Sequence, residues 1–316
     1  MKKKLSIIIL NWNGKEDTLA CLASLEKQDT QNFEVLLVDN GSRDDSVEAF
    51  SKHYPHHTLI LTHANLGYAG GNNLGIDHAL KRGADLVLLL NNDTEMDKDF
   101  ISNLLRSTDE KPEGGIFGPK VVRHSARDTL DHMGGFWSSE IGEYKPFLFN
   151  KPERDFQEMQ ELDYISGCSI LIRREVIEKI GKLDPRFFLL WEESDFCARA
   201  KNAGFSIWAT PRATLFHKVS ASFEGKAMMQ YYWWRNRLLW MRKNLDKSEY
   251  KKVFRRVVLK EIIKYHRHSL LKKLGLVYLK IMNPKKITEK RLLKLKRYQA
   301  GCKGIHDYYQ RRFYKM

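Results

Sequence analysis

The chain has 316 residues, of which 42% are hydrophobic and 29% charged, and this composition excludes an intrinsically disordered protein. Its four cysteines lie far apart without a CxxC pair, and neither a signal-peptide core nor a run of about 18 apolar residues occurs, so we expect a reducing, cytoplasmic setting and no membrane span. The net charge is +15, but residues 225–316 hold 27 Lys or Arg and 5 Asp or Glu, whereas residues 1–224 hold 27 and 34.

The first 120 residues alternate between short apolar runs and helical segments. Apolar runs of five or six residues separated by helices predict a mostly parallel sheet covered on both faces, as in Rossmann-like α/β folds. The expected strands are Leu5–Leu10, Phe33–Asp39, Thr58–Thr62 and Ala84–Leu90, and the expected helices are Glu16–Leu25, Asp44–Phe50, Asn72–Lys81 and Lys98–Leu105, the last capped by Asp97.

The second half of the body is less regular. Glycines and prolines interrupt residues 108–165, where we expect loops and short strands. Order returns with an expected strand at Ser169–Arg173, a helix at Arg174–Ile180, a helix from Glu192 to Ala203, and a last strand at Phe205–Ala209. After Ser222 the sequence is helical and basic. The pattern therefore divides the chain into an α/β body, residues 1–224, and a basic helical region, residues 225–316.

Polar residues follow three of the expected strands: Asn11-Trp12-Asn13-Gly14, Asp39-Asn40-Gly41-Ser42 and Asn91-Asn92-Asp93. In a parallel sheet these strand ends lie along one edge, where α/β proteins bind ligands. Asp39 suits either a ribose contact or an Asx-turn. Asp93 suits either a turn or a Mg²⁺ or Mn²⁺ site. No GxxxxGK[ST] loop occurs, and the glycine-rich Gly67–Gly75 does not fit GxGxxG, although a glycine-rich turn before a helix presents N–H groups that suit a diphosphate.

A second acidic group, Glu192-Glu193-Ser194-Asp195, begins a helix directly after the apolar stretch Phe187–Trp191. Acids in a first turn complement the helix dipole, which explains some of them. Three of four exceed what capping needs, and a carboxylate with a hydrophobic wall can serve as a general base near neutral pH. His217 follows a strand and a Pro-containing loop, and a lone histidine of this kind is either structural or a ligand.

The ordered series NWNG, VDNGSRDDS, NLGYAGGNN, LLLNNDTE, SGCSILIRREVI, FFLLWEESDFCARA, TLFH and YYWWRNRLLWMRK resembles the inverting family-2 glycosyltransferases of GT-A fold, especially their rhamnosyltransferase-like branch. The resemblance covers about residues 4–244. It implies transfer of a sugar from a nucleotide-diphosphate donor. The favoured donor is dTDP-L-rhamnose, and a UDP-hexose is the next. The expected acceptor is a glycan or a lipid-linked glycan, and the expected cofactor is Mn²⁺ or Mg²⁺.

The resemblance also implies roles for individual residues. Asn91-Asn92-Asp93 stands in place of the family's DxD, so Asp93 carries most of the metal contact, with Asn91 beside it and His217 completing the metal site. Glu193 matches the catalytic base, and Glu192 and Asp195 stay open as alternatives. The positions that match donor-binding residues are Asn11, Asn13, Asp39, Ser42 (supported by Asp44), Asn65, Gly67, Gly70, Asn72, Asn92 and, for the diphosphate, Arg235.

The basic region allows more than one function. Residues 228–240 crowd aromatic side chains with arginines, which is typical either of a helix in a membrane interface or of a helix packed on the body. Lysines surround apolar residues in Leu270–Met282, which favours a membrane surface, and we expect a peripheral enzyme at the inner face of a bacterial plasma membrane. A nucleic-acid-binding protein or metal-dependent nuclease is the alternative, although the acidic body disfavours it. A third possibility is an inactive transferase-like binding module, which a turnover assay would distinguish from an active enzyme.

Overall fold

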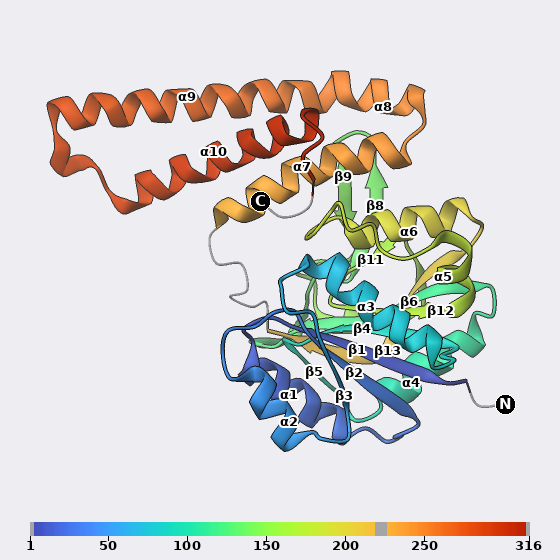
Figure 1. Ribbon diagram of the computed structural model, residues 1–316. Coiled ribbons are helices and arrows are strands. Elements are labelled where there is room, and N and C mark those ends of the chain that lie inside the picture. Colours follow the sequence, from blue (N-terminus) through green and yellow to red (C-terminus); the bar gives the residue numbers. More distant parts are fainter. Residues whose placement is uncertain (1–2, 219–225, 314–316) are drawn as a thin grey trace.

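The computed structural model describes residues 3–218 and 226–313. Across these ranges an α/β body carries a set of long helices at one end (Figure 1). The expected boundary between residues 224 and 225 falls within 219–225, outside the described residues. The expected fold, a mostly parallel sheet with helices followed by a basic helical region, is confirmed.

The central sheet has ten strands within the described residues, in the order β10-β13-β6-β12-β4-β1-β2-β3, with β5 added at β13 and β7 at β6. Strands β4, β1, β2 and β3 are parallel, whereas β12 runs antiparallel to both β4 and β6. A smaller sheet has the order β11-β8-β9. The strands are β1 Leu5–Asn11, β2 Phe33–Asp39, β3 Thr58–Leu61, β4 Leu86–Asn91, β5 Thr94–Met96, β6 Gly114–Arg123, β7 Ala126–Leu130, β8 Gly134–Ser138, β9 Glu143–Pro146, β10 Gln160–Glu161, β11 Tyr164–Ile165, β12 Ser169–Arg173 and β13 Ser206–His217.

Helices cover both faces of the central sheet, with α1 and α2 below it and α3 above it in Figure 1. Consecutive residues of β1, such as Ile7, Ile8 and Ile9, are therefore fully buried on both faces, which explains why the strand is continuously apolar. The helices are α1 Lys15–Glu26, α2 Ser46–His53, α3 Gly67–Lys81, α4 Phe100–Glu110, α5 Arg174–Ile180, α6 Glu192–Asn202, α7 Lys226–Asn244, α8 Lys247–Val253, a π-helical segment Phe254–Val258, α9 Leu259–Met282 and α10 Glu289–Tyr309, with single 3-10 turns at Glu153–Asp155 and Pro284–Lys286.

The expectation of loops and short strands across residues 108–165 was wrong for β6, which is a buried inner strand of ten residues between β12 and β13. Its glycines serve packing rather than turns. A Cβ on Gly118 would lie 2.3 Å from Cγ2 of Ile165, so only glycine fits where the two segments meet. Strand β13 is also longer than expected, because a register shift between Ala209 and Thr214 accommodates Pro211 within it.

Two helix starts differ from expectation. Helix α3 begins at Gly67 rather than at Asn72, so the glycine-rich segment forms its first turns. Helix α4 begins after Asp99, and Asp97 is not its cap; the backbone carbonyl of Asp97, rather than its carboxylate, accepts from the N–H of Phe100. Three of the four residues 97–100 are polar or charged, so the sequence pattern does not distinguish one acid from the other as the cap.

Helix α7 packs on the body instead of presenting its aromatic side chains at the surface. Tyr231, Tyr232, Trp234 and Trp240 are all buried. Trp234 and Trp240 share one hydrophobic cluster with Phe187 and Trp191 of the body, and Tyr231 and Tyr232 share another with Phe188. Full burial of a large apolar side chain contributes about 1.5–3 kcal/mol, so these contacts attach the helix firmly. The packed-helix interpretation is therefore correct for α7, and the membrane-interface interpretation is wrong for these residues.

Candidate active site

The carboxyl ends of β1 and β2 meet in one hydrogen-bonded group. Asn11 pairs with Asp39 in the strand register, and its Nδ2 donates to Oδ2 of Asp39 at 2.9 Å and to Oγ of Ser42 at 3.0 Å. The N–H of Ser42 donates to Oδ1 of Asp39 at 2.9 Å, three residues on from Asp39 rather than the two residues of an Asx-turn. Asp39 is buried, so this group forms a fixed rim around which a nucleoside could bind.

Asn13 and Asn92 extend the same rim on its two sides. Asn13 has a left-handed backbone (φ 51°), and its Oδ1 accepts from the N–H of Arg43 at 2.7 Å. Asn92, in the turn after β4, donates from Nδ2 to Oγ1 of Thr18 at 2.9 Å, and Thr18 in turn donates to Oδ1 of Asn11 at 2.9 Å. The ends of β1, β2 and β4 are thus joined by side chains, as the positions of their polar residues predicted.

The glycine-rich segment has a different role from the expected diphosphate cradle. Oδ1 of Asn65 accepts from the N–H of Gly67 at 2.8 Å, and Oδ1 of Asn40 accepts from the N–H of Leu66 at 2.9 Å. The next two N–H groups, of Tyr68 and Ala69, both point at the carbonyl oxygen of Phe188, at 2.7 and 3.4 Å. The first backbone donors of α3 are therefore occupied within the protein.

Close packing explains the glycines of this segment and the burial of Asn72. Gly67 has φ +74°, and a Cβ there would lie 2.4 Å from the carbonyl oxygen of Phe188. A Cβ on Gly70 would approach Cβ of Leu66 to 2.8 Å. Asn72 is buried and donates to the carbonyl oxygen of Tyr68 at 3.0 Å. The segment consequently fixes residue 188 against the N-terminus of α3.

Asp93 and His217 lie side by side although 124 positions separate them, because β13 brings His217 to the turn after β4. Oδ2 of Asp93 is 3.5 Å from Nε2 of His217, and Nδ1 of the same ring is 2.9 Å from Oδ2 of Asp131. Burial alone lowers the pKa of His217, but the hydrogen bonds to Asp131 and Asp93 outweigh it and raise the pKa to about 9. Two carboxylates therefore share one positive charge in this place.

The fit of a divalent metal depends on what the donor substrate would supply. Among the described residues no group of three or more His, Cys, Asp or Glu side chains is arranged to hold a metal ion. A nucleotide-bound Mg²⁺ or Mn²⁺ needs only one or two carboxylates, since substrate phosphates and water provide the other ligands. Asp93 is buried to 6% exposure and borders His217, so this pair fits a phosphate-bound ion, with Asn91 adjacent at the end of β4.

Of the three acids at the start of α6, Glu193 lines a cavity. It lines an open cavity of about 270 Å³ together with His132, Glu143, Tyr144, Tyr164, Leu190, Trp191, Ser194 and Trp233. Its Oε2 and that of Glu192 have no hydrogen-bond partner among the described residues. Burial raises the pKa of Glu193 to about 7, and burial together with the neighbouring charge of Glu193 holds the pKa of Glu192 well above its usual range. Glu193 thus has the environment of a general base.

Tyr68 connects the two acidic groups. Its hydroxyl donates to the carbonyl oxygen of Gly167 at 2.6 Å. Burial, and then the charges of Glu192, Glu193 and Asp93, hold the pKa of Tyr68 well above its usual range. One buried tyrosine is therefore influenced by the charges of both the base candidate and the metal candidate.

Asp195 belongs to a structural ion-pair network instead. It is fully buried and accepts from Nε of Arg199 at 2.9 Å, Nζ of Lys243 at 2.9 Å and Nδ2 of Asn244 at 3.0 Å. Lys243 and Asn244 belong to α7, so Asp195 ties α6 to α7. Both oxygens of its carboxylate accept from these donors, and Asp195 does not line the cavity of Glu193.

Arg235 also differs from expectation, since it is fully buried and holds backbone rather than a diphosphate. Its Nη2 donates to the carbonyl oxygens of Arg186 and Phe187 at 2.9 and 2.8 Å. The next residue, Asn236, donates from Nδ2 to the carbonyl oxygens of Phe187, Leu189 and Leu190, each at 2.8 Å. The expected diphosphate contact of Arg235 is therefore corrected: the burial of its guanidinium keeps it from the donor edge.

These bonds fix a strained loop directly before the candidate base. Phe188, Leu190 and Trp191 all have left-handed backbones, with φ of 63°, 70° and 74°. Non-glycine residues in this region cost of order 1–3 kcal/mol each and persist only when their surroundings hold them. Helix α3 holds the loop through Phe188, and α7 holds it through Arg235 and Asn236. The position of Glu193 therefore depends on both helices.

Sequence reasoning missed four residues that organise the site: Thr18, Tyr68, Asp131 and Asn236. Asp131 follows β7 in the segment expected to be loops, where no pattern links it to His217. Asn236 lies within a stretch that the aromatic side chains dominate. The polar triplet Arg235-Asn236-Arg237, between the aromatic run 231–234 and the apolar run 238–240, was the available signal.

Comparison with known proteins gives a consistent result. The sequence model of the family described as "Glycosyl transferase family 2" matches residues 6–181. An N-acetylglucosaminyl-diphospho-decaprenol L-rhamnosyltransferase of Mycobacterium tuberculosis is 28% identical over 220 residues, covering 64% of this chain and 72% of that protein. The dTDP-rhamnosyl transferase RfbF of Shigella flexneri is 24% identical over 253 residues, covering 77% and 82%.

Solved structures resemble the chain in fold. S. aureus TarS, residues 1–349, superposes with a TM-score of 0.54 at 14% identity, covering 99% of this chain and 93% of that one. The mannosyltransferase PcManGT of Pyrobaculum calidifontis, solved with GDP-Man and Mn²⁺, gives a TM-score of 0.55 at 11% identity, covering 99% and 88%. At these identities the likeness concerns the fold, which is of GT-A type.

Proposed function

Because the chain belongs to glycosyl transferase family 2, as a rhamnosyltransferase-like member of GT-A fold, we propose that it transfers L-rhamnose from dTDP-L-rhamnose to a lipid-linked glycan with inversion. A UDP-hexose is the second candidate donor. The observation that carries the proposal is that Glu193 lines the cavity and that its Oε2 has no hydrogen-bond partner among the described residues, while Asp93 and His217 lie side by side at the turn after β4. Such transfer would serve cell-wall or polysaccharide biosynthesis.

The rim at the ends of β1 and β2 would bind the nucleoside of the donor. Asn11, Asp39 and Ser42 are already oriented by their mutual hydrogen bonds, so little side-chain entropy is lost when a ligand binds there. Asn13 and Asn92 border the same rim, and Asn65, Gly67, Gly70 and Asn72 shape its floor through α3. The Shigella flexneri relative, a dTDP-rhamnosyl transferase, supports the choice of donor.

Asp93, with His217 and Asn91 beside it, would hold a divalent ion that neutralises charge on the diphosphate leaving group. The adjacent Asp131 would orient the His217 ring through Nδ1, an arrangement that metal-binding histidines commonly use. The Mn²⁺ and GDP-Man in the mannosyltransferase structure support this ligand class. The choice between Mn²⁺ and Mg²⁺ belongs to the experiment below.

Glu193 would accept the proton of the acceptor hydroxyl as that oxygen attacks the anomeric carbon. Its pKa of about 7 suits this role, because the base is then ionised in a large fraction of molecules at neutral pH and still binds a proton well. Burial and the neighbouring charge of Glu193 hold the pKa of Glu192 well above its usual range, which favours the protonated form of Glu192 over a second charge beside the base. Attack from the cavity side, with the diphosphate leaving at the metal side, gives inversion.

The cavity of Glu193 would receive the acceptor. Trp191, Trp233, Tyr144 and Tyr164 offer it aromatic surfaces, and His132 and Glu143 offer polar groups. The Mycobacterium tuberculosis relative is an N-acetylglucosaminyl-diphospho-decaprenol rhamnosyltransferase, which supports an acceptor with a lipid-linked diphosphate. No helix among the described residues is long and apolar enough to cross a membrane. A lipid-linked acceptor would bring the enzyme, as a peripheral protein, to the inner face of the bacterial plasma membrane.

A thermal-shift panel of nucleotide sugars, each with and without Mn²⁺ or Mg²⁺, tests the proposal. The true donor should raise the melting temperature by mass action, with about 2.7 kcal/mol of stabilisation at 100 times its Kd, and the gain should disappear without metal. Asp93→Asn should lose the metal-dependent part, whereas Asp128→Asn, an exposed acid on β7, should keep it. If no nucleotide sugar stabilises the protein under any metal condition, the proposed function is wrong.

A further inference from the structure

The C-terminal helices end in a hairpin tip that extends beyond the body (Figure 1). We call residues 270–296 the distal hairpin; it contains the second half of α9, the Pro284–Lys286 turn and the first turns of α10. The C-terminal half of α10, where its buried residues lie, packs along α7. Tyr265 of α9 packs on Trp234 and Tyr298. The hairpin is thus anchored at its base, while no residue of α9 is fully buried.

One face of α9 in the distal hairpin is apolar and open to solvent. Leu270, Leu274, Val277 and Ile281 recur at the i, i+4, i+7 and i+11 positions of a helix and are 51–74% exposed. Leu271, Tyr278 and Met282 widen this stripe and are exposed to a similar degree. The opposite face, with Leu276 and Leu279, turns toward α10. The hairpin therefore presents an apolar surface that no described part of the chain covers.

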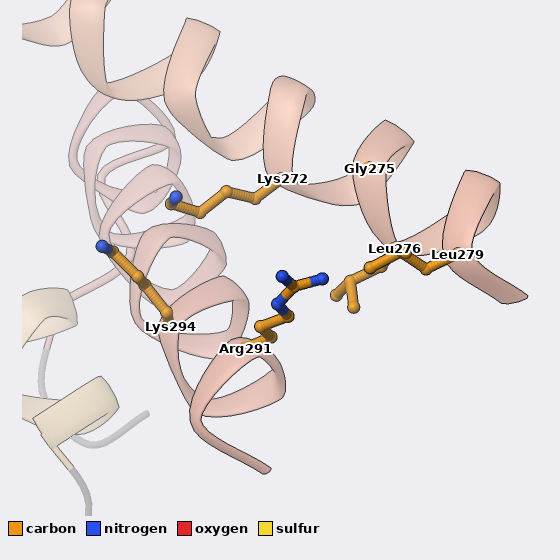
Figure 2. A pocket seen from close by; sticks show the side chains of 6 residues that line it. All are labelled: Lys272, Gly275, Leu276, Leu279, Arg291 and Lys294. Carbon is orange, nitrogen blue, oxygen red and sulfur yellow. The ribbon is translucent and has the colours of Figure 1, made fainter. Parts of the chain in front are cut away.

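The distal hairpin is also strongly cationic. It holds nine Lys or Arg residues and a single acid, Glu289. Lys272 of α9 and Arg291 and Lys294 of α10 lean into the gap between the helices, beside Leu276 and Leu279 (Figure 2). These residues line a cavity of about 200 Å³. Three cations next to two leucines suit a ligand that joins a phosphate to hydrocarbon.

The combination of cations with an exposed apolar stripe favours a lipid surface over a nucleic acid as the partner. Lysines and arginines alone would serve either phosphate-rich partner. The exposed leucines, isoleucine and methionine stabilise a complex only when the partner removes them from water, and a bilayer interface does so along the whole stripe. A nucleic-acid backbone is hydrated and offers no such medium.

The geometry points to the distal hairpin as the element that binds this enzyme to a membrane rich in anionic phospholipid. Its apolar stripe enters the headgroup region, and its cations, including the Lys272–Arg291–Lys294 pocket, bind lipid phosphates. This inference deepens the proposed function by naming the contact with the membrane. It assigns that contact to residues 270–296 and not to the buried aromatic side chains of α7.

Vesicle co-sedimentation of the full chain tests it, with phosphatidylcholine vesicles and with vesicles that also contain phosphatidylglycerol. Binding should require the anionic lipid and weaken with salt. The variant Lys272→Gln/Arg291→Gln/Lys294→Gln should lose roughly 100-fold in partition coefficient, because each cation near an anionic surface contributes roughly a factor of five. Leu274→Ser/Ile281→Ser should lose a similar or larger factor.

Matched controls lie on the body. Lys52→Gln/Lys81→Gln/Lys179→Gln removes three exposed lysines, and Leu61→Ser/Ile141→Ser removes two exposed apolar side chains; both should keep vesicle binding within about twofold. All variants should retain donor stabilisation in the thermal-shift assay. That assay tests the proposed function, on which the inference rests, so its failure can be told apart from a failure of membrane binding. The inference is overturned if vesicles do not bind, if hairpin and control variants behave alike, if the hairpin binds RNA or DNA but not vesicles, or if the apolar variant only abolishes self-association.

Discussion

The side-chain amide of Asn236 lies 2.8 Å from the carbonyl oxygen of Leu190, so a residue of α7 holds the left-handed loop that leads to Glu193. The same Nδ2 is equally close to the carbonyl oxygens of Phe187 and Leu189. An amide nitrogen has only two hydrogens, and the three carbonyl groups must share them. The candidate active site therefore depends on α7, which belongs to the basic helical region rather than to the α/β body.

Asn236→Ala should reduce both stability and turnover. The substitution leaves buried carbonyl groups without a donor, so we expect the free energy of unfolding to fall by about 3 kcal/mol. Release of the loop should also displace Glu193 and lower kcat more than it raises KM for the donor. Urea unfolding and steady-state transfer kinetics measure the two effects. Asn202→Ala, at an exposed position near the end of α6, is the control; equal effects of both substitutions would contradict the proposed clamp.

Gly67→Ala and Gly83→Ala separate backbone strain from crowding. Both glycines have left-handed backbones, with φ of +74° and +81°, so each alanine should cost about 1–2 kcal/mol for that reason. At Gly67 the new Cβ would also meet the carbonyl oxygen of Phe188 at 2.4 Å, whereas at Gly83 nothing lies within 4 Å. We expect Gly67→Ala to lose transfer activity and more stability than Gly83→Ala, which should stay active. Retention of full activity in a folded Gly67→Ala protein would disprove the role of this contact.

The rate of transfer should depend on pH through Glu193. Because burial raises the pKa of this carboxyl to about 7, kcat/KM should increase with pH up to about 7 and level off above it. Glu193→Gln should lower kcat by roughly 10²–10⁴ and leave donor binding unchanged. Glu158→Gln, at an exposed position, should behave as wild type. A wild-type pH profile in the Glu193→Gln variant would assign the base elsewhere.

The same carboxyl should also affect stability, with the opposite sign. Its pKa rises from 4.5 to about 7 on folding, so the native state binds more protons than the unfolded state in this range. The stability that this group contributes is fully present below about pH 4.5 and is lost as pH rises through about 7. Unfolding curves between pH 5 and 8 should therefore show a smaller decline for Glu193→Gln than for wild type.

Asp131→Asn should weaken metal binding without removing a proposed metal ligand. Asp131 holds Nδ1 of His217 at 2.9 Å, and loss of such a supporting carboxylate typically costs 10–100-fold in metal affinity. Titration of Mn²⁺ in the presence of dTDP measures the Kd. Asp128→Asn, three residues earlier, should leave the Kd unchanged; an unchanged Kd in Asp131→Asn as well would show that His217 does not serve the metal.

The residue pattern alone predicts the fold class and the edge at which the site lies. Continuous apolar runs such as Ile7–Ile9 require burial on both faces, and the period of strand and helix requires parallel pairing, so Asn11, Asp39 and Asn91 had to come to one edge. These are local or nearest-neighbour effects. The acids after Trp191 also indicated Glu193 as a candidate base, and the order of the motifs indicated Asp93 as a candidate metal ligand.

Long-range packing decides which candidate residues line the cavity and which support the fold. Glu193 and Asp195 are two positions apart on one helix, yet Glu193 lines a cavity and Asp195 is held by Lys243 of α7 and by Arg199. Arg235 and Asp131 likewise acquire their roles from partners 49 and 86 residues away. A carboxylate or guanidinium takes its function from its charged and buried surroundings, and long-range packing sets those surroundings.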